Sequence, residues 1–164
     1  MDVAVVEANL SNSDHAQGLL DILDSYARDP MGGARPLRQP VRERLIPALA
    51  AQANSLILLA IGHGNFIGTA VCFLGFSTFA ARPLLNIHDL AVLPEFRGLG
   101  IGRTLLDAAE SRARQLNCCK LTLEVREDNE RARSLYRSVG FGDYTIGTGP
   151  TPTQFLEKRL ETVA

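Results

Sequence analysis

The chain has 164 residues and a formal net charge of −1 at pH 7, with 46% hydrophobic and 21% charged residues. This length can bury a core without metals or disulfides, so we expect residues 1–164 to form a single domain. The lack of a basic excess gives no reason to expect nucleic acid or an anionic membrane as a partner.

The first third of the chain predicts one strand followed by two helices. Residues 2–8 read as a strand, and the polar run 11–14 offers several N-caps for a helix whose apolar positions have helical spacing. Residues 29–33 are rich in glycine and proline and end that helix. A second helix is predicted over residues 40–53, either kinked or split by Pro47.

The rest of the chain predicts three consecutive strands and then an alternation of helices and strands. Residues 55–61 and 66–76 are strands joined by a glycine-rich hairpin turn. The later elements are a strand over 84–93, a helix over 102–116, a strand over 120–126, a helix over 129–139 and a final strand over 154–160. This order indicates an α/β protein of the α+β type, with a mixed, mostly antiparallel central sheet and helices on both faces.

The N-terminal sequence, the lack of a long apolar stretch and the cysteine pattern favour a cytoplasmic protein. The start Met1-Asp2-Val3 lacks the basic and then apolar pattern of a secretory signal, and the most apolar stretch, 55–61, is far shorter than the roughly 20 residues that span a bilayer. The three cysteines, with Cys118 and Cys119 adjacent, fit neither a disulfide framework nor metal-ligand spacing. We therefore expect buried free thiols and no metal site.

The most informative segment lies between the strand that ends near residue 93 and the helix that follows it. Gly98, Gly100 and Gly102 lack Cβ atoms, so the backbone can approach a ligand and turn its N–H groups toward one point. The helix adds unpaired N-terminal N–H groups and the positive end of its dipole, while Arg97 and Arg103 add charge. Such an arrangement is typical of a phosphate site.

Two other interpretations of these glycines remain open: a plain tight turn, or a dinucleotide-binding domain of the Rossmann type. A Rossmann site needs G-x-G-x-x-G in a βαβ unit, whereas the glycines here run G-x-G-x-G after a strand that closes a meander. A Walker loop is excluded, because no Gly-Lys-Ser/Thr follows.

Arg97-x-x-Gly100-x-Gly102 resembles the Q/R-x-x-G-x-G/A signature of the GCN5-related N-acetyltransferase (GNAT) family, and residues 89–98 resemble its usual lead-in. The resemblance implies acetyl-CoA as cosubstrate. The implied contacts are backbone amides of the pyrophosphate loop and the main chain of a bulged strand that pairs with the pantetheine arm. They comprise Leu90, Ala91, Val92, Arg97, Gly98, Leu99, Gly100, Ile101, Gly102 and Arg103.

A second motif follows the strand predicted over 120–126. Residues 129–141 resemble the family signature N-x-x-A-x-x-L-Y-x-x-x-G-F at every fixed position. Asn129 is a good N-cap, and the resemblance also implies that it contacts coenzyme A. Tyr136 is either a core aromatic or, as the resemblance implies, the group that stands near the sulfur and protonates the departing thiolate.

Candidate bases lie just before the predicted bulge and on the next strand. The amine must be neutral to attack a thioester, yet an alkyl amine with a pKa of about 10.4 is mostly protonated. His88 and Glu124 are candidate bases, acting directly or through water. Many family members, the diamine acetyltransferases among them, have Glu-Asp where this chain has His88-Asp89, which argues against a diamine substrate. Neighbours on a strand point to opposite faces, so at most one of His88 and Asp89 is expected to line the cleft directly.

The family builds its acceptor site from the first two helices and their loop and from the loop before the last strand, here residues 26–37 and 147–153. The sequence thus predicts an acetyl-CoA-dependent N-acetyltransferase that serves a primary amine of a small molecule or peptide by direct attack in a ternary complex. Family habit also suggests a homodimer. The alternative from another class is a non-catalytic regulatory module that binds coenzyme A.

Overall fold

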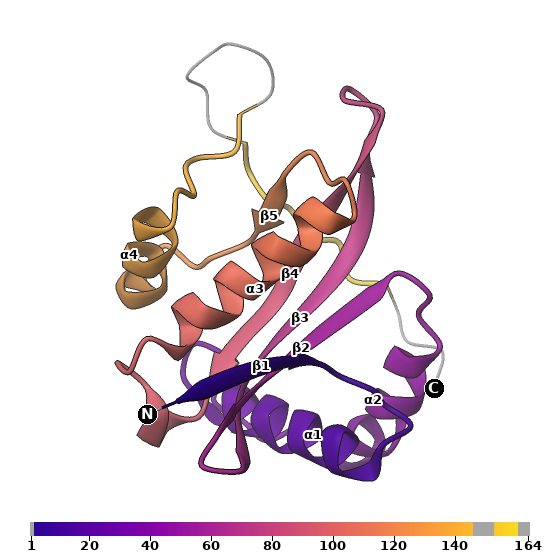
Figure 1. Cartoon of the computed structure of the whole chain (residues 1–164), viewed down its shortest axis with the longest axis vertical. Coiled ribbons are helices and arrows are strands. Elements are labelled where there is room, and N and C mark those ends of the chain that lie inside the picture. Colours follow the sequence, from indigo (N-terminus) through magenta and orange to yellow (C-terminus); the bar gives the residue numbers. More distant parts are fainter. Residues whose placement is uncertain (1, 146–152, 161–164) are drawn as a thin grey trace.

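A computed structural model describes residues 2–145 and 153–160 (Figure 1). In chain order the elements are β1 (Val3–Glu7), α1 (Ser13–Arg28), α2 (Gln39–Ala50), β2 (Ser55–Gly62), β3 (Asn65–Ser77), β4 (Arg82–Val92), the short 3₁₀ turn η1 (Pro94–Phe96), α3 (Ile101–Gln115), β5 (Leu121–Leu123) and α4 (Glu130–Ser138). All four predicted helices are present, and α2 is one continuous helix that contains Pro47 rather than a split one.

The five strands form one sheet in the order β1-β2-β3-β4-β5. The first three pairs are antiparallel, and β4 with β5 is the only parallel pair among the described strands. The turn between β2 and β3 has two residues, His63 and Gly64, both with positive φ, as a type I′ hairpin requires. The predicted mixed, mostly antiparallel sheet is confirmed.

Helices cover both faces of this sheet, as predicted. One core cluster joins α3 and α4 to one face and includes the fully buried Ile67, Leu85 and Leu105. The other joins α1 and α2 to the opposite face and includes Leu19 and Leu59. Figure 1 shows α3 running along the strands, with α1 and α2 together at the opposite end of the view from the long β3–β4 hairpin.

A β-bulge in β4 changes which face its side chains meet. Opposite Val71 and Cys72 of β3 stand Asp89 and Ile87, so His88 is an extra residue without a partner on β3. Before the bulge, Ile87 packs on the α3 face; after it, Leu90 packs there and Ala91 packs on the α1 face. The bulge thus resets the alternation of inward and outward residues just before the strand ends.

A buried carboxylate joins α1 to the chain that leads into α2. Asp24 is 8% exposed, forms ion pairs with Arg28 and Arg42 at 3.0 Å each, and accepts a 2.8 Å hydrogen bond from Leu37 N–H. Burial alone raises the pKa of this carboxyl, but the hydrogen bonds from Leu37, Arg28 and Arg42 outweigh it and lower the pKa. The end of the α1–α2 loop is therefore fixed by a charge inside the protein.

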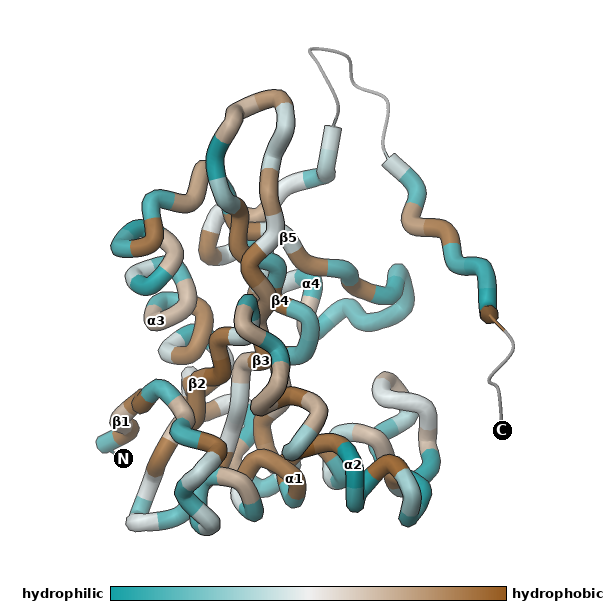
Figure 2. The backbone as a smooth tube through the Cα atoms, turned by 90° about the vertical axis from the view of Figure 1, so that its right-hand side faces the viewer, coloured by the Kyte–Doolittle hydropathy of each residue, from teal (hydrophilic) through white to brown (hydrophobic). Residues whose placement is uncertain are grey.

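Three expectations from the sequence are wrong in whole or in part: the final strand, the length of the strand over 120–126, and the burial of all three cysteines. Residues 154–160 form no strand; after a hydrogen bond from Thr153 N–H to Tyr144 O, this segment lies apart from the sheet with Phe155, Leu156 and Leu160 about four-fifths exposed (Figure 2). The strand predicted over 120–126 is only three residues long, because its pairing with β4 ends early. Of the cysteines only Cys72 is buried, whereas Cys118 and Cys119 are half-exposed.

Candidate active site

The residues singled out in the two motifs line one cleft of about 820 Å³. Its walls are the end of α1 and the loop after it, the last part of β4, the start of α3, residues 124–132 and α4. The cleft contains His88, Leu90, Ala91, Val92, Arg97, Gly98, Gly100, Ile101, Gly102, Arg103, Glu124, Asn129 and Tyr136. Leu99 is the one predicted contact residue that does not line it, and its side chain is 59% exposed.

The cleft exists because β4 and β5 diverge. Their parallel pairing runs from Leu85 opposite Leu121 to Ile87 opposite Leu123 and stops there. Beyond this point β4 continues to Val92 and stays paired with β3 on its other side. Within the described part of the chain, the edge of β4 that faces the cleft at residues 88–92 therefore has no neighbouring strand, so its backbone groups are available to an extended ligand.

The loop between β4 and α3 lines the same cleft, with glycines that let a ligand come close to the backbone N–H groups. Gly98 and Gly100 have φ of 78° and 82°, values at which a side chain would be strained. Gly100 is the N-cap of α3 and provides no side chain to accept from the helix. The first N–H groups of α3, on Ile101, Gly102 and Arg103, lack intrahelical acceptors and carry the positive end of the helix dipole. This arrangement fits a diphosphate.

Gly102 has a different reason to be glycine. A Cβ at this position would lie 3.0 Å from Leu135 Cδ2 of α4, so the missing side chain lets the two helices approach each other. Arg103 strengthens the same contact by donating to Ser138 Oγ at 2.8 Å. The third glycine of the first motif thus positions the second motif beside the loop.

Arg97 connects three parts of the cleft. Its Nε donates to the carbonyl oxygen of Val92 at 3.0 Å, and its Nη1 forms a 2.8 Å ion pair with Asp29 in the loop after α1. The Asp29 pKa is lowered by the hydrogen bond from Met31 N–H and by the Arg97 guanidinium. Sequence reasoning found Arg97 as a source of positive charge but missed this partner, which lies 68 residues away.

Tyr136 lies on the cleft-facing side of α4, where its ring packs against Phe141 at a centroid distance of 5.9 Å. Burial, together with the neighbouring Tyr26, raises the pKa of the Tyr136 phenol to about 12. Tyr26 comes from the end of α1, and burial and the nearby Asp89 and Asp29 raise its pKa as well. Both phenols are therefore protonated at neutral pH.

The two candidate bases line the cleft from different strands. His88 is the bulged residue of β4 and packs edge-on against Phe73, with ring centroids 5.6 Å apart. Glu124 follows β5, and Asn86 Nδ2 donates to its Oε1 at 3.4 Å and to Thr122 Oγ1 at 3.1 Å. Asn86 was missed by sequence reasoning, because the parallel register that places it beside Thr122 is not visible in the chain.

Asp89 does not line the cleft, so only one member of the His88-Asp89 pair does, as expected from the sequence. Burial raises the pKa of its carboxyl, and the nearby His88 opposes this shift. On the acceptor side, Tyr26 and Met31 line the cleft from the predicted 26–37 segment. Residues 147–152 of the predicted 147–153 segment lie outside the described residues, but Phe155, shortly after that segment, lines the cleft.

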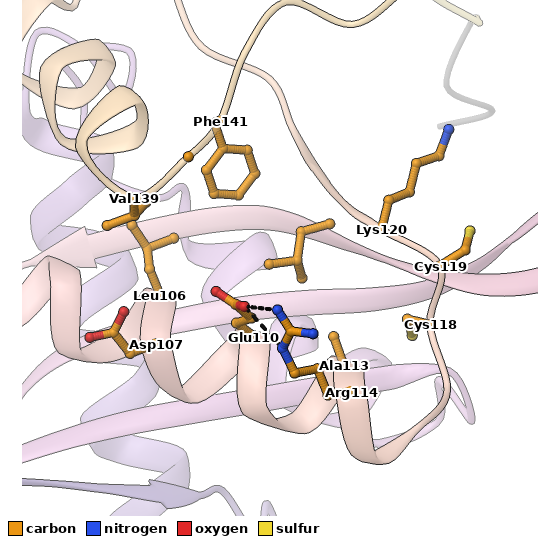
Figure 3. Close-up of a pocket in the computed structure, with 12 residues that line it drawn as sticks. Leu106, Asp107, Glu110, Ala113, Arg114, Cys118, Cys119, Lys120, Val139 and Phe141 are labelled. Carbon is orange, nitrogen blue, oxygen red and sulfur yellow. Dashed lines mark hydrogen bonds and ion pairs between the residues drawn. The ribbon is translucent and has the colours of Figure 1, made fainter.

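A second pocket of about 280 Å³ lies between α3, the chain before β5 and the residues after α4. Figure 3 shows Glu110 paired with Arg114 at its base and Phe141, Lys120 and Cys119 around it. It holds neither the phosphate-binding loop nor Tyr136, so it is separate from the cleft that contains both motifs.

Comparison with known proteins agrees with this geometry. Residues 19–141 match the profile of the family described as Acetyltransferase (GNAT) family, which is well over half of the chain. The chain belongs to the GNAT family. It is an acetyl-CoA-dependent N-acetyltransferase, because acetyl-CoA is the acetyl donor that this family implies.

Other acetyltransferases resemble it over half to nearly all of its length. An uncharacterized N-acetyltransferase, YhfO of Bacillus subtilis, is 35% identical over 103 residues, covering 63% of this chain and 69% of that protein. A thialysine N-epsilon-acetyltransferase of Bos taurus is 32% identical over 51% of this chain and 48% of its own length. A crystal structure of a probable acetyltransferase shares the fold with a TM-score of 0.77 at 22% identity, covering 94% and 99% of the two chains. None of the helices within residues 2–145 and 153–160 is long and apolar enough to cross a membrane.

Gly100→Val should weaken acetyl-CoA binding by about 100-fold or more, because a branched side chain at positive φ disturbs the loop whose N–H groups face the cleft. Isothermal titration calorimetry measures this. Gly64→Val is the matched control: Gly64 has a φ of 77° and an added Cβ would meet nothing, but it lies in the β2–β3 turn. The control should lose stability while keeping its affinity for acetyl-CoA. Equal affinity in both variants would contradict the phosphate site.

Proposed function

We propose that this GNAT enzyme transfers the acetyl group to a primary amine of a small molecule or peptide by direct attack within the cleft. The observation that carries the proposal is the free β4 edge beyond Ile87, with the phosphate-binding loop at one end and Tyr136, His88 and Glu124 in the same cleft. Donor site and candidate catalytic groups thus share one space, so a ternary complex needs no covalent intermediate on the enzyme.

The backbone is proposed to bind the donor. The amides at the start of α3 and in the preceding loop hold the pyrophosphate, and the main chain of Leu90, Ala91 and Val92 pairs with the pantetheine arm. An N–H near Ala91 or Val92 then polarises the thioester carbonyl as negative charge develops on its oxygen. These roles need only main-chain groups, so leucine, alanine and valine, which have no polar or reactive side chain, can serve here.

Tyr136 is proposed to donate a hydrogen bond to the departing thiolate. Its pKa of about 12 keeps the phenol protonated and so able to donate throughout the neutral range. Complete transfer of the phenol proton to the thiolate is less favourable. An ordinary thiol has a pKa of about 8.5, so this transfer is uphill by roughly 5 kcal/mol. Stabilisation of the thiolate by hydrogen bonding therefore fits Tyr136 better than complete protonation.

The base is proposed to be His88, with Glu124 attracting the cationic amine. His88 is the bulged residue at the start of the free edge, three residues before Ala91, near which the thioester carbonyl is proposed to lie, and its imidazole can accept a proton from the amine. Glu124 is separated from that edge by the divergence of the strands, and Asn86 already donates to it.

The acceptor is not identified, and the name of one relative suggests where to begin. Thialysine carries a side-chain amine, so amino acids with such amines join polyamines, aminoglycosides and peptide N-termini in the substrate panel. Acetyl-CoA should bind in calorimetry, and one class of amine should release free thiol in its presence. Binding without turnover of any amine would favour the regulatory module, and an absence of binding would refute the proposed donor site.

Tyr136→Phe should lower kcat by roughly 10²–10⁴-fold while changing the affinity for acetyl-CoA very little, because only the hydroxyl that meets the leaving sulfur is lost. Thiol release and calorimetry measure the two quantities. Tyr144→Phe is the control, since the Tyr144 hydroxyl contacts Lys120 and does not line the cleft. An unaltered kcat would remove Tyr136 from the chemistry.

His88→Asn should lower kcat about 100-fold, because the amide cannot accept the proton of the amine. Glu124→Gln should mainly raise the KM for the amine, because it removes charge attraction rather than the proton acceptor. Steady-state measurement of kcat and KM in both variants separates the roles. A kcat that is kept in His88→Asn and lost in Glu124→Gln would assign the base to Glu124 instead.

A further inference from the structure

Asp29 stands where an acidic residue is unfavourable by local criteria. It is the C-cap of α1, and a negative charge at a helix C-terminus opposes the helix dipole. Its side chain accepts a 2.9 Å hydrogen bond from Met31 N–H, a bond that the amide oxygen of asparagine would also form. The negative charge therefore needs another partner, and Arg97 is that partner at 2.8 Å.

The Arg97–Asp29 pair is well shielded and joins two functional regions. The side chains of Arg97 and Asp29 are 22% and 19% exposed, and both residues line the cleft. On one side Arg97 precedes the phosphate-binding glycines and holds the carbonyl of Val92. On the other side Asp29 begins the loop over residues 29–37, whose Met31 lines the cleft. One guanidinium thus links the donor end of the cleft to the loop that borders it.

The loop is tied to Asp29 at its beginning and to Asp24 at its end. Gly32 N–H and Ala34 N–H donate to the Asp29 carbonyl at 2.8 and 3.0 Å, in addition to the Met31 bond to the side chain. At the far end Leu37 N–H donates to the buried Asp24. Asp24 has its own arginines, Arg28 and Arg42, so only the Asp29 end depends on a residue of the phosphate-binding segment.

We propose that Arg97 is shared between the acetyl-CoA phosphates and Asp29, so that donor binding weakens the Arg97–Asp29 pair and loosens residues 30–36 for entry of the acceptor amine. The inference rests on the proposed function, because it assumes a diphosphate at the loop. Asp29 acts as a positioning residue, through Arg97 and the loop, and takes no part in the chemistry.

The direction of this effect follows from charge. Two anions that approach one guanidinium repel each other and compete for its N–H groups, so each weakens the binding of the other. Coupling between sites is reciprocal: if acetyl-CoA loosens the loop, then the anchored loop must lower the affinity for acetyl-CoA. Asp29→Asn removes the charge while retaining the Met31 hydrogen bond, and so isolates the electrostatic contribution.

Hydrogen exchange on the full chain, followed by mass spectrometry, tests the proposal. In the wild-type protein, acetyl-CoA should increase exchange in peptides covering residues 30–36, the opposite of the protection that a ligand usually confers on residues beside its site. In Asp29→Asn, exchange in these peptides should already be raised without acetyl-CoA and should change little when it is added. The amide of Leu37, held by Asp24, is the internal reference.

Calorimetry gives the second readout. Asp29→Asn should bind acetyl-CoA about fivefold more tightly, the effect expected of one partly exposed charge pair. Asp21→Asn, an exposed residue of α1 whose side chain contacts Gln17, is the matched control and should bind as the wild type does. Unchanged or reduced exchange in wild-type residues 30–36 on binding would overturn the sharing of Arg97, as would equal affinity of Asp29→Asn and wild type. Failure of the wild type to bind acetyl-CoA at all would instead refute the proposed function.

Discussion

The end of the pairing between β4 and β5 is the constraint on which the site depends. Two parallel strands that stay together leave no free backbone between them, whereas here the contact stops after Ile87 and Leu123. The divergence leaves one side of β4 without a neighbour among the described strands, and the start of α3 and α4 border the opening. The cleft is thus a gap within the sheet, and most of its donor-binding surface is main chain.

Both motifs could be predicted from the sequence because each is local. The loop from Arg97 to Arg103 and the helix from Asn129 to Gly140 specify their own geometry through glycine, capping residues and helical spacing. The structure shows this in the positive φ of Gly98 and Gly100 and in the Asn129 cap, which accepts from Ala132 N–H. The separate role of Gly102, in the contact with Leu135, depends on a second helix and was not apparent.

The sequence alone could not predict the strand pairing and side-chain contacts that join distant segments. The short β5 and the unpaired residues 154–160 both alternate well enough to predict longer strands, but alternation says nothing about whether a neighbouring edge exists. The Arg97–Asp29 pair and the Asn86–Glu124 contact likewise need the tertiary fold to bring their members together. Each half of these pairs looks like an ordinary surface residue in the chain.

The bulge at His88 has a consequence for how the gene can vary. Because His88 is one residue more than regular alternation needs, losing a single codon here would remove the bulge and leave Leu90 facing α3 and Ala91 facing α1, whereas gaining a codon would turn Leu90 toward α1 and Ala91 toward α3. Substitutions in this stretch can be absorbed one side chain at a time, whereas an added residue would invert every later position up to the phosphate-binding loop. The spacing between Ile87 and Arg97 is therefore expected to tolerate changes of residue type far better than insertions.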